Sequence, residues 1–372
     1  MLHAPVTVES WRDAESVKRW QQRLTPGSFV TFSSILKGYL EWVGMGPDEL
    51  IAWGKSSNDP YVVLDSMQKY VIQGLKGRRY KTQVNAYAAM RSFFTHNRVV
   101  LPQDRSFQIR GDAPPVERKL TIDNLRELIG LAAQPYRSMI LVKWMGLLDT
   151  EGLIYFSNHC AEKVVQAIKE GKGFVQIGIP GRKRSRNVRS FYTFIGHDAL
   201  ESLREYFDRE RGWPMPGESV WITGNVALPV TKFTFAQAWL RLLRKAKLIP
   251  KKAGGLMTRY GYNAHNTRDL AISLLNTVSG INPQVIEFWA GHDIDKLGYN
   301  QFWTVKPQYV EEQYQLAEPV LNIVTNWQPE GLKDLSKENQ QLQDLVKKQG
   351  EDIANLQGRL GQFETILKTK LI

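Results

Sequence analysis

The residues whose types and spacing could do chemistry lie between positions 265 and 299. His265 and Arg268 are three residues apart at the start of a predicted helix, a spacing that puts two side chains on one face. His292 follows the glycine that ends a second predicted helix, and Tyr299 comes seven residues later. Arginine and histidine can donate to phosphate oxygens as charge develops there, and a tyrosine hydroxyl can attack phosphorus. These residue types suit phosphoryl transfer to a tyrosine.

The basic charge of the chain is unevenly distributed. Its 372 residues carry a formal net charge of +12 at pH 7. Residues 331–372 hold seven basic and six acidic side chains, so +11 of the charge belongs to residues 1–330. The basic side chains form three clusters: Lys76, Arg78, Arg79 and Lys81; Arg182, Lys183, Arg184, Arg186 and Arg189; and Arg241, Arg244, Lys245, Lys247, Lys251 and Lys252. Such clusters indicate a nucleic-acid partner, with a solvated basic surface as the alternative.

Composition and motifs exclude several classes of protein. With 42% hydrophobic and 23% charged residues, the chain has the composition of a folded globular protein. The sequence contains no run of about 18 apolar residues, the length needed to span a membrane. Residues 1–13 contain no secretory signal. Cys160 is the single cysteine, which excludes an intrachain disulfide and indicates a reducing, intracellular compartment. The six histidines are scattered and no nucleotide-binding Gly-rich loop is present, so we expect neither a metal nor another cofactor.

Helical periodicity predicts a small all-helical domain over residues 1–103. Its main predicted helices span residues 29–42, 60–74 and 81–96. Residues 104–119 lose this periodicity and contain Gly111, Pro114 and Pro115, which indicates a linker between domains.

Residues 120–327 are predicted to form a second, mostly helical domain. The expected helices span residues 122–133, 136–148, 199–210, 232–246, 265–278 and 283–290. Residues 174–179 and 189–195 are rich in β-forming side chains and flank a Pro-Gly-Arg-Lys-Arg-Ser-Arg turn, so we expect an antiparallel ribbon. The predicted fold class is therefore mainly α with a small β component (α+β).

The tail, residues 328–372, has a heptad pattern of its own. With Leu332 at an a position, later a positions include Asn339, Val346 and Ile353, and apolar residues recur at d over about five heptads. Three glycines within the pattern each cost about 1 kcal/mol relative to alanine in a helix. The heptads favour a coiled coil that joins copies of the chain, and a single helix packed on the rest of the chain is the alternative.

Over roughly residues 15–320, the helical domain, the hairpin and the His-x-x-Arg, Gly-His and Tyr motifs resemble the tyrosine recombinases, the phage-integrase-like enzymes of DNA strand exchange. The resemblance implies that His265 and Arg268 are the family's His-x-x-Arg pair, that His292 is its second histidine and that Tyr299 is the nucleophile. It further implies a core-binding domain followed by a catalytic domain, with double-stranded DNA clamped between them. A tetramer on DNA and the absence of a cofactor are also implied.

The family's catalytic lysine lies on a β-hairpin, which corresponds here to residues 174–195. Lys183 is the first choice, and Lys172, Arg184 and Arg186 are alternatives because the turn does not align closely. The candidate DNA-binding residues are Lys76, Arg78, Arg79, Lys81, Arg182, Arg184, Arg186, Arg189, Arg244 and Lys245.

One position departs from the family's pattern. The family has an arginine in a Thr-Gly-Leu-Arg-x-x-Glu motif, and residues 145–151 here read Met-Gly-Leu-Leu-Asp-Thr-Glu. Leu148 therefore occupies the position of that arginine, and loss of such a phosphate clamp costs on the order of 10² to 10³ in rate. Either Arg137 or a residue of the 182–189 cluster replaces it, or cleavage is impaired.

Three functions follow from these features. We expect a site-specific recombinase or integrase that cuts and rejoins duplex DNA through a covalent 3′-phosphotyrosine. The alternatives are a DNA-binding protein of the same fold whose cleavage is impaired by Leu148 and, less favoured, an enzyme of the type IB topoisomerase kind.

Overall fold

The structure is a computed structural model, and it describes residues 11–111, 117–181, 190–223, 227–250, 261–294, 301–325, 345–351, 353 and 357. The chain divides into two units, Met1–Val116 and Glu117–Ile372. In the described ranges it is mostly helical with two small antiparallel sheets, which confirms the predicted fold class. Over the same ranges no helix is long and apolar enough to cross a membrane.

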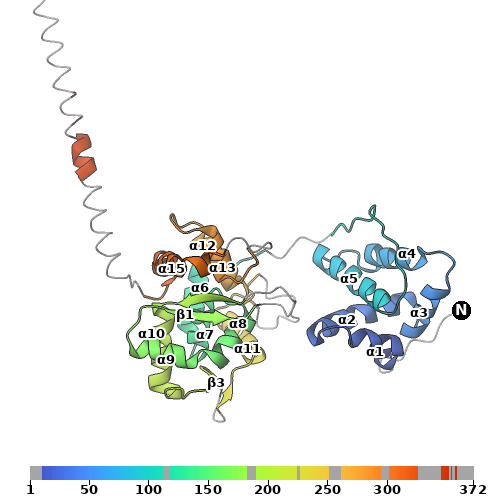
Figure 1. Cartoon of the computed structure of the whole chain (residues 1–372), viewed down its shortest axis with the longest axis horizontal. Helices are drawn as coiled ribbons and strands as arrows, with labels where there is room; N and C mark the ends of the chain where they lie inside the picture. The colour runs from blue at the N-terminus through green and yellow to red at the C-terminus, as the bar shows by residue number, and fades with distance from the viewer. Residues whose placement is uncertain are drawn as a thin grey trace, which may run out of the picture. The chain divides into compact units, whose positions relative to one another are not determined.

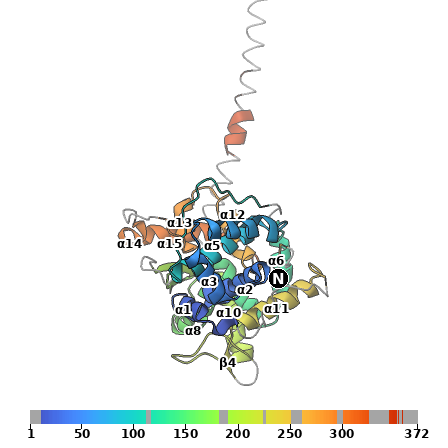
Figure 2. The ribbon, with the colours of Figure 1, turned by 90° about the vertical axis from the view of Figure 1, so that its right-hand side faces the viewer.

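The first unit is a set of helices around an aromatic core (Figure 2). Its elements are η1 (Trp11–Asp13), α1 (Glu15–Gln21), α2 (Pro26–Val43), α3 (Pro47–Ser56), α4 (Val62–Lys69), the π-helix η2 (Tyr70–Gly74) and α5 (Tyr80–His96). Trp20 of α1 is fully buried, meets the Phe93 ring edge to face at 5.3 Å and donates from Nε1 to Ser92 Oγ at 3.0 Å. Helices α1 and α2 both pack against α5, so this aromatic cluster joins the unit.

The second unit is built around one buried helix, α7 (Figure 1). Its helices are α6 (Ile122–Leu131), α7 (Tyr136–Met145), α8 (Thr150–His159), α9 (Ala161–Lys169), α10 (His197–Tyr206), the π-helix η3 (Phe207–Arg211), α11 (Lys232–Lys245), α12 (Asn266–Leu275), α13 (Pro283–Trp289), α14 (Phe302–Val305) and α15 (Pro307–Leu321). Helix α7 packs against α6, α8, α10, α12, α15 and strand β2 (Phe191–Ile195). Every residue from Ser138 to Met145 is buried as a result.

A β-hairpin of β1 (Val175–Ile179) and β2 covers one side of α7, and this confirms the predicted antiparallel ribbon. Its register runs from the pair Val175 and Ile195 to the pair Ile179 and Phe191. Val175, Ile177 and Ile179 are buried while the residues between them are exposed, the period of two of a strand with one buried face. The second sheet pairs β3 (Ile222–Thr223) with β4 (Leu228–Pro229).

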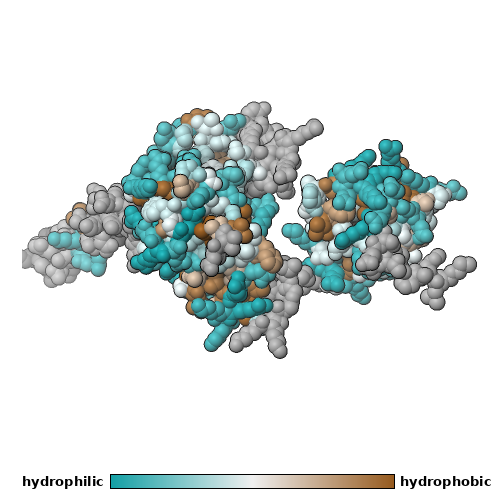
Figure 3. All heavy atoms as spheres, turned by 90° about the horizontal axis from the view of Figure 1, so that it is seen from below, coloured by the Kyte–Doolittle hydropathy of each residue, from teal (hydrophilic) through white to brown (hydrophobic). Residues whose placement is uncertain are grey.

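Hydrophilic side chains cover most of the face of each unit that is visible in Figure 3. Exposed apolar side chains are scattered, for example Val30 of α2 and Phe233 of α11, each 70% exposed. Isolated apolar side chains of this kind are normal on a protein surface. The visible face therefore offers more hydrophilic than apolar area.

Candidate active site

Helix α12 begins directly after His265 and places Arg268, three residues after that histidine, in its first turn. The chain enters this helix through two polar contacts: Thr267 Oγ1 donates to Ala264 O at 2.8 Å, and the Asn266 side-chain amide donates to Gly261 O. Arg268 is only 1% exposed, which is rare for a charged side chain without a specific partner. The backbone N–H groups of a first helical turn add to the positive potential there.

Gly291 ends α13 in a Schellman motif, and this motif positions His292. The His292 N–H donates to Glu287 O at 3.0 Å, and the Gly291 N–H donates to Phe288 O at 2.8 Å. Gly291 has a φ of +66°, and a Cβ at this position would lie 2.4 Å from the Phe191 ring. Only glycine meets both conditions. The turn brings His292 back over the last turn of α13, beside Glu287.

The His292 side chain joins Arg268 to Glu287. Its Nε2 lies 2.6 Å from Arg268 Nη2, and its Nδ1 is hydrogen-bonded to the Glu287 carboxylate. Because a guanidinium can only donate, Nε2 must accept, so the neutral ring carries its proton on Nδ1 and donates it to Glu287. The His292 side chain is 42% exposed. The site therefore combines a buried cation with an accessible imidazole whose tautomer is fixed.

His265 and Arg268 lie in different surroundings, although their spacing suggested a shared face. His265 precedes the first residue of α12 and its side chain is 56% exposed, with Nε2 3.8 Å from Asp269 Oδ1. Asp269 also meets Arg118, with 3.4 Å between Oδ2 and Nε. Arg268 points instead into the unit, toward His292. The structure thus joins Arg268 with His292 and leaves His265 at the rim of the helix start.

Aromatic side chains hold the end of the β-hairpin beside His292. The Phe191 ring lies against Gly291, and Tyr192 meets the Phe288 ring edge to face at 5.0 Å. Tyr192 also donates from its hydroxyl to Trp303 O of α14 at 3.1 Å. Burial, with a smaller effect of the Glu311 charge, raises the pKa of Tyr192 to about 12. This tyrosine is therefore a neutral hydrogen-bond donor that fastens the hairpin to α14.

Several predicted site residues lie outside the described part of the chain. Among them are the candidate nucleophile Tyr299, the candidate lysine Lys183 and the basic residues Arg182, Arg184, Arg186 and Arg189. The flanking residues are described: Phe302, three residues after Tyr299, lies 5.9 Å from Phe288 between ring centroids. The alternative Lys172 lies before β1, at the far end of the hairpin from Gly291, and pairs with Glu170 at 2.7 Å. Lys172 therefore lies away from Arg268 and His292 in this structure.

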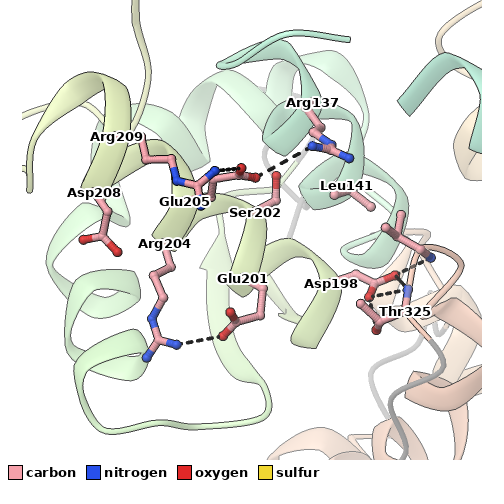
Figure 4. A pocket seen from close by; sticks show the side chains of 11 residues that line it. Arg137, Leu141, Asp198, Glu201, Ser202, Arg204, Glu205, Asp208, Arg209 and Thr325 are labelled. Carbon is pink, nitrogen blue, oxygen red and sulfur yellow. Dashed lines mark hydrogen bonds and ion pairs between the residues drawn. The ribbon is translucent and has the colours of Figure 1, made fainter. Parts of the chain in front are cut away.

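Leu148 is a core side chain, and Arg137 lies too far from it to take the place of the arginine in the family's motif. Leu148 is 1% exposed and packs within the hydrophobic core of the second unit. Arg137 lies at the opposite end of α7, about 12 Å along the helix from Met145. There it faces Glu205 of α10, with 3.7 Å between Nη1 and Oε2, at the edge of a charged pocket (Figure 4). In this structure Arg137 therefore does not lie beside Leu148.

The basic residues predicted to bind DNA fall into two described groups. Lys76, Arg78 and Lys81 are exposed around the turn between η2 and α5 in the first unit. In the second unit, Lys245 donates from Nζ to Leu131 O at 3.3 Å and so also holds the end of α6. Both groups therefore offer exposed basic side chains to a polyanion, while Arg79 and Arg244 are half-buried.

Glu287 is the site residue that the sequence prediction missed. Its signal was present in the sequence as Glu, Gly and His at positions i, i+4 and i+5. At this spacing a Schellman motif brings the second residue after the helix cap, here His292, over the last turn of the helix, which contains Glu287. No group of three or more His, Cys, Asp or Glu side chains that could hold a metal ion occurs among the described residues.

Neither a scan of protein-family models nor a search of curated proteins finds a match to this chain. The solved structures that are similar to it are tyrosine recombinases and integrases, the family that the motifs resembled. The Tn1549 transposon integrase in complex with a circular intermediate DNA is 16% identical with a TM-score of 0.42, over 66% of this chain and 84% of the integrase.

Two further solved structures cover more of the chain. A lambda integrase dimer bound to a core site is 13% identical with a TM-score of 0.47, over 82% of this chain and 95% of that one. The XerA recombinase is 15% identical with a TM-score of 0.34, over 87% and 98%. At these identities and TM-scores, what the chain does has to be inferred from its own residues.

Proposed function

We propose that this protein is a site-specific DNA strand transferase that cuts and rejoins duplex DNA through Tyr299. The observation that carries the proposal is the contact of 2.6 Å between Arg268 and His292, next to the hairpin end. Both side chains can donate to the non-bridging oxygens of one phosphate, where charge grows in the transition state. Glu287 would stabilise the imidazolium that His292 must become in order to donate from Nε2.

The proposed reaction has two balanced steps. The Tyr299 oxygen forms a bond to phosphorus while the bond from phosphorus to the 5′ oxygen breaks, which leaves a 3′-phosphotyrosine and a free 5′ hydroxyl. The tyrosine proton passes to a base of the site, and a hairpin lysine, for which Lys183 is the candidate, protonates the leaving oxygen. The reverse attack by a 5′ hydroxyl of a second strand restores the DNA backbone. The phosphotyrosine retains the energy of the phosphodiester bond that was cut, so rejoining needs no cofactor.

Duplex DNA is the proposed partner. The exposed cluster of Lys76, Arg78 and Lys81 in the first unit can follow a phosphate backbone by counterion release. The Tn1549 and lambda integrase structures are complexes with DNA. Exchange between two duplexes needs four cleavages, so a tetramer on DNA is part of the proposal.

The test is capture of a covalent protein–DNA adduct. Duplexes of randomised sequence would each carry a nick, so that the released strand diffuses away and the adduct accumulates. Wild-type protein should give an adduct on denaturing gels, Tyr299→Phe should give none, and Arg268→Gln should slow its formation on the order of 10²-fold. Tyr309→Phe, ten residues away on α15, is the matched control and should behave as wild type.

One observation favours a second candidate, a DNA-binding protein without cleavage. Leu148 lies in the core, so the arginine of the family's motif has no counterpart at this position. Tight binding of duplex DNA with no adduct at any protein concentration would select this candidate and reject the first. Sequence-independent relaxation of supercoiled plasmid would instead indicate a topoisomerase.

A further inference from the structure

A buried lysine lies where the chain lacks the expected arginine. Lys143 of α7 is fully buried, and its Nζ donates to the carbonyl oxygen of Leu148 at 2.5 Å. The Leu148 N–H in turn donates to Lys143 O at 3.1 Å. The ammonium group is therefore held at the backbone of the residue from which an arginine would have extended.

This turn lies at the same end of the β-hairpin as the Arg268 and His292 pair. Leu148 and Ile179 side-chain atoms are 3.5 and 3.7 Å from the point where Gly152 would carry a Cβ, so both flank that glycine. Ile179 pairs with Phe191 across the hairpin, and the Phe191 ring lies against Gly291. One pair of strand residues thus separates the Leu148 turn from the turn that presents His292.

The direction of the Lys143 side chain agrees with this placement. Leu141 of α7 lines the charged pocket beside α10 that is shown in Figure 4. Lys143 is two residues further on, about 200° around the helix, and therefore points away from α10. Helix α12, which carries Arg268, also packs against α7. A buried cation can still contact an accessible residue of this site. Arg268 is only 1% exposed and yet is hydrogen-bonded to the accessible His292.

We propose that Lys143 supplies the positive charge of the phosphate site that Leu148 cannot supply. The inference rests on the proposed function, because it assigns a second cation to the same phosphate. In a site of low dielectric, a fixed ammonium near the phosphate stabilises developing charge more than it would in water. A purely structural role is the competing explanation, since a lysine can also bind the last carbonyl groups of a helix.

Four variants separate the two roles: Lys143→Met, Lys143→Arg, Leu148→Arg, and the pair Lys143→Met with Leu148→Arg. We expect Lys143→Met to slow adduct formation on the order of 10²-fold at saturating protein, with DNA affinity nearly unchanged. Lys143→Arg should stay within about tenfold of wild type, as should the double variant, in which the cation has moved to position 148. Lys163→Met, an exposed lysine of α9, is the charge-matched control.

A second readout does not depend on DNA cleavage. Inorganic phosphate would be titrated into the full-length protein while the imidazole signals of His292 are followed by NMR. Wild type should bind phosphate, and Lys143→Met should weaken binding about tenfold without loss of the folded spectrum.

Unchanged phosphate affinity in Lys143→Met, or no phosphate-dependent shift in wild type, would overturn the inference about Lys143. A lower melting temperature in Lys143→Met with an unchanged adduct rate, and no rescue by Leu148→Arg, would also overturn it. Normal phosphate binding by wild type with no adduct on any DNA would overturn the proposed function alone.

Discussion

At the scale of single residues, the site depends on which nitrogen of His292 carries the proton. Arg268 donates a hydrogen bond to Nε2, and Glu287 accepts one from the N–H at Nδ1, so the ring is held between a donor and an acceptor. A phosphate that enters the site would compete for Arg268 and free Nε2. Glu287 then still holds the ring through its hydrogen bond to Nδ1, and it is therefore a positioning residue for the proposed reaction.

We predict that Glu287→Leu loses this control. While no phosphate is bound, Arg268 still fixes the tautomer in this variant. Once a phosphate takes Arg268, nothing holds the proton on Nδ1, and the rate of adduct formation should fall about tenfold or more. Nitrogen chemical shifts of His292 at high pH, with inorganic phosphate bound, report the tautomer directly. Glu287→Gln is the matched control, because its amide oxygen still accepts from Nδ1 and should preserve the tautomer. An unchanged tautomer in Glu287→Leu would remove Glu287 from the mechanism.

Sequence spacing identified Arg268 and His292, and the structure brings them together from two helices. It did not identify Glu287, because that residue acts through a C-terminal helix motif whose geometry is local but not periodic. Lys143 was hidden for a different reason. It lies within the apolar run of α7, where a lysine looks like a break in a buried helix. Side-chain reach across a turn cannot be inferred from residue type alone.

At the scale of elements, most of the longer helices and the hairpin were predictable, but α15 was not predicted and the boundaries of the buried helix α7 were not found. Helix α7 is buried on all sides, so its sequence has no polar face to mark where it ends. The predicted end at Leu148 overshoots, because Gly146 follows the last helical residue and Leu147 adopts a φ of +51°. The short helices α3, α8 and α9 were not identified individually. Their limits depend on packing in the two units more than on propensity.

The start of α10 and the end of α15 share a buried acid that makes this junction sensitive to pH. Glu318 is fully buried, and its Oε1 accepts from the His197 N–H at 2.9 Å. Its Oε2 and the Tyr314 hydroxyl have no hydrogen-bond partner. Burial, and to a smaller extent the charge of Asp198, raises the pKa of Glu318 from 4.5 to about 7. The folded protein therefore holds a proton here that the unfolded chain releases.

Because this pKa is raised on folding, its stabilising effect is complete below about pH 4.5 and is lost as the pH rises to about 7. We predict that Glu318→Gln, which cannot ionise, nearly equals wild type in stability at pH 4. At pH 8 it should exceed wild type by up to about 3 kcal/mol, the equivalent of the shift. Burial lowers the pKa of His197 and gives the opposite trend, so the difference between the two proteins is the quantity to measure.

Denaturant unfolding at both pH values gives that difference. Glu312→Gln on the exposed face of α15 is the control for loss of one negative charge, and it should show no such dependence. If Glu318→Gln were less stable than wild type at pH 8, the Glu318 carboxylate would have to be ionised and well solvated in the fold, contrary to its burial.

At the scale of the whole molecule, the basic charge and the predicted coiled coil belong to different parts of the chain. Nearly all of the +12 lies in residues 1–330, whereas residues 331–372 add only +1. The expected coiled coil falls largely outside the described residues, but two of its a positions are described. Val346 and Ile353 are 66% and 56% exposed. Neither is covered by the rest of a single chain, so at these two positions the chain offers an apolar stripe rather than a packed helix.

We therefore predict that the tail drives self-association on DNA rather than DNA binding by one copy. Deletion of residues 331–372, or Val346→Asp with Ile353→Asp, should weaken assembly at least tenfold. The deletion removes the heptads, and each substitution places a charged side chain at an a position, which is buried in a coiled coil. The affinity of one copy for a half-site should change little, since the basic clusters remain. Light scattering of the protein–DNA complex gives the mass, and Lys347→Asp with Lys348→Asp, at b and c, is the control. Unchanged complex mass after the deletion would show that contacts elsewhere hold the copies together, and the heptads would then have to serve another partner.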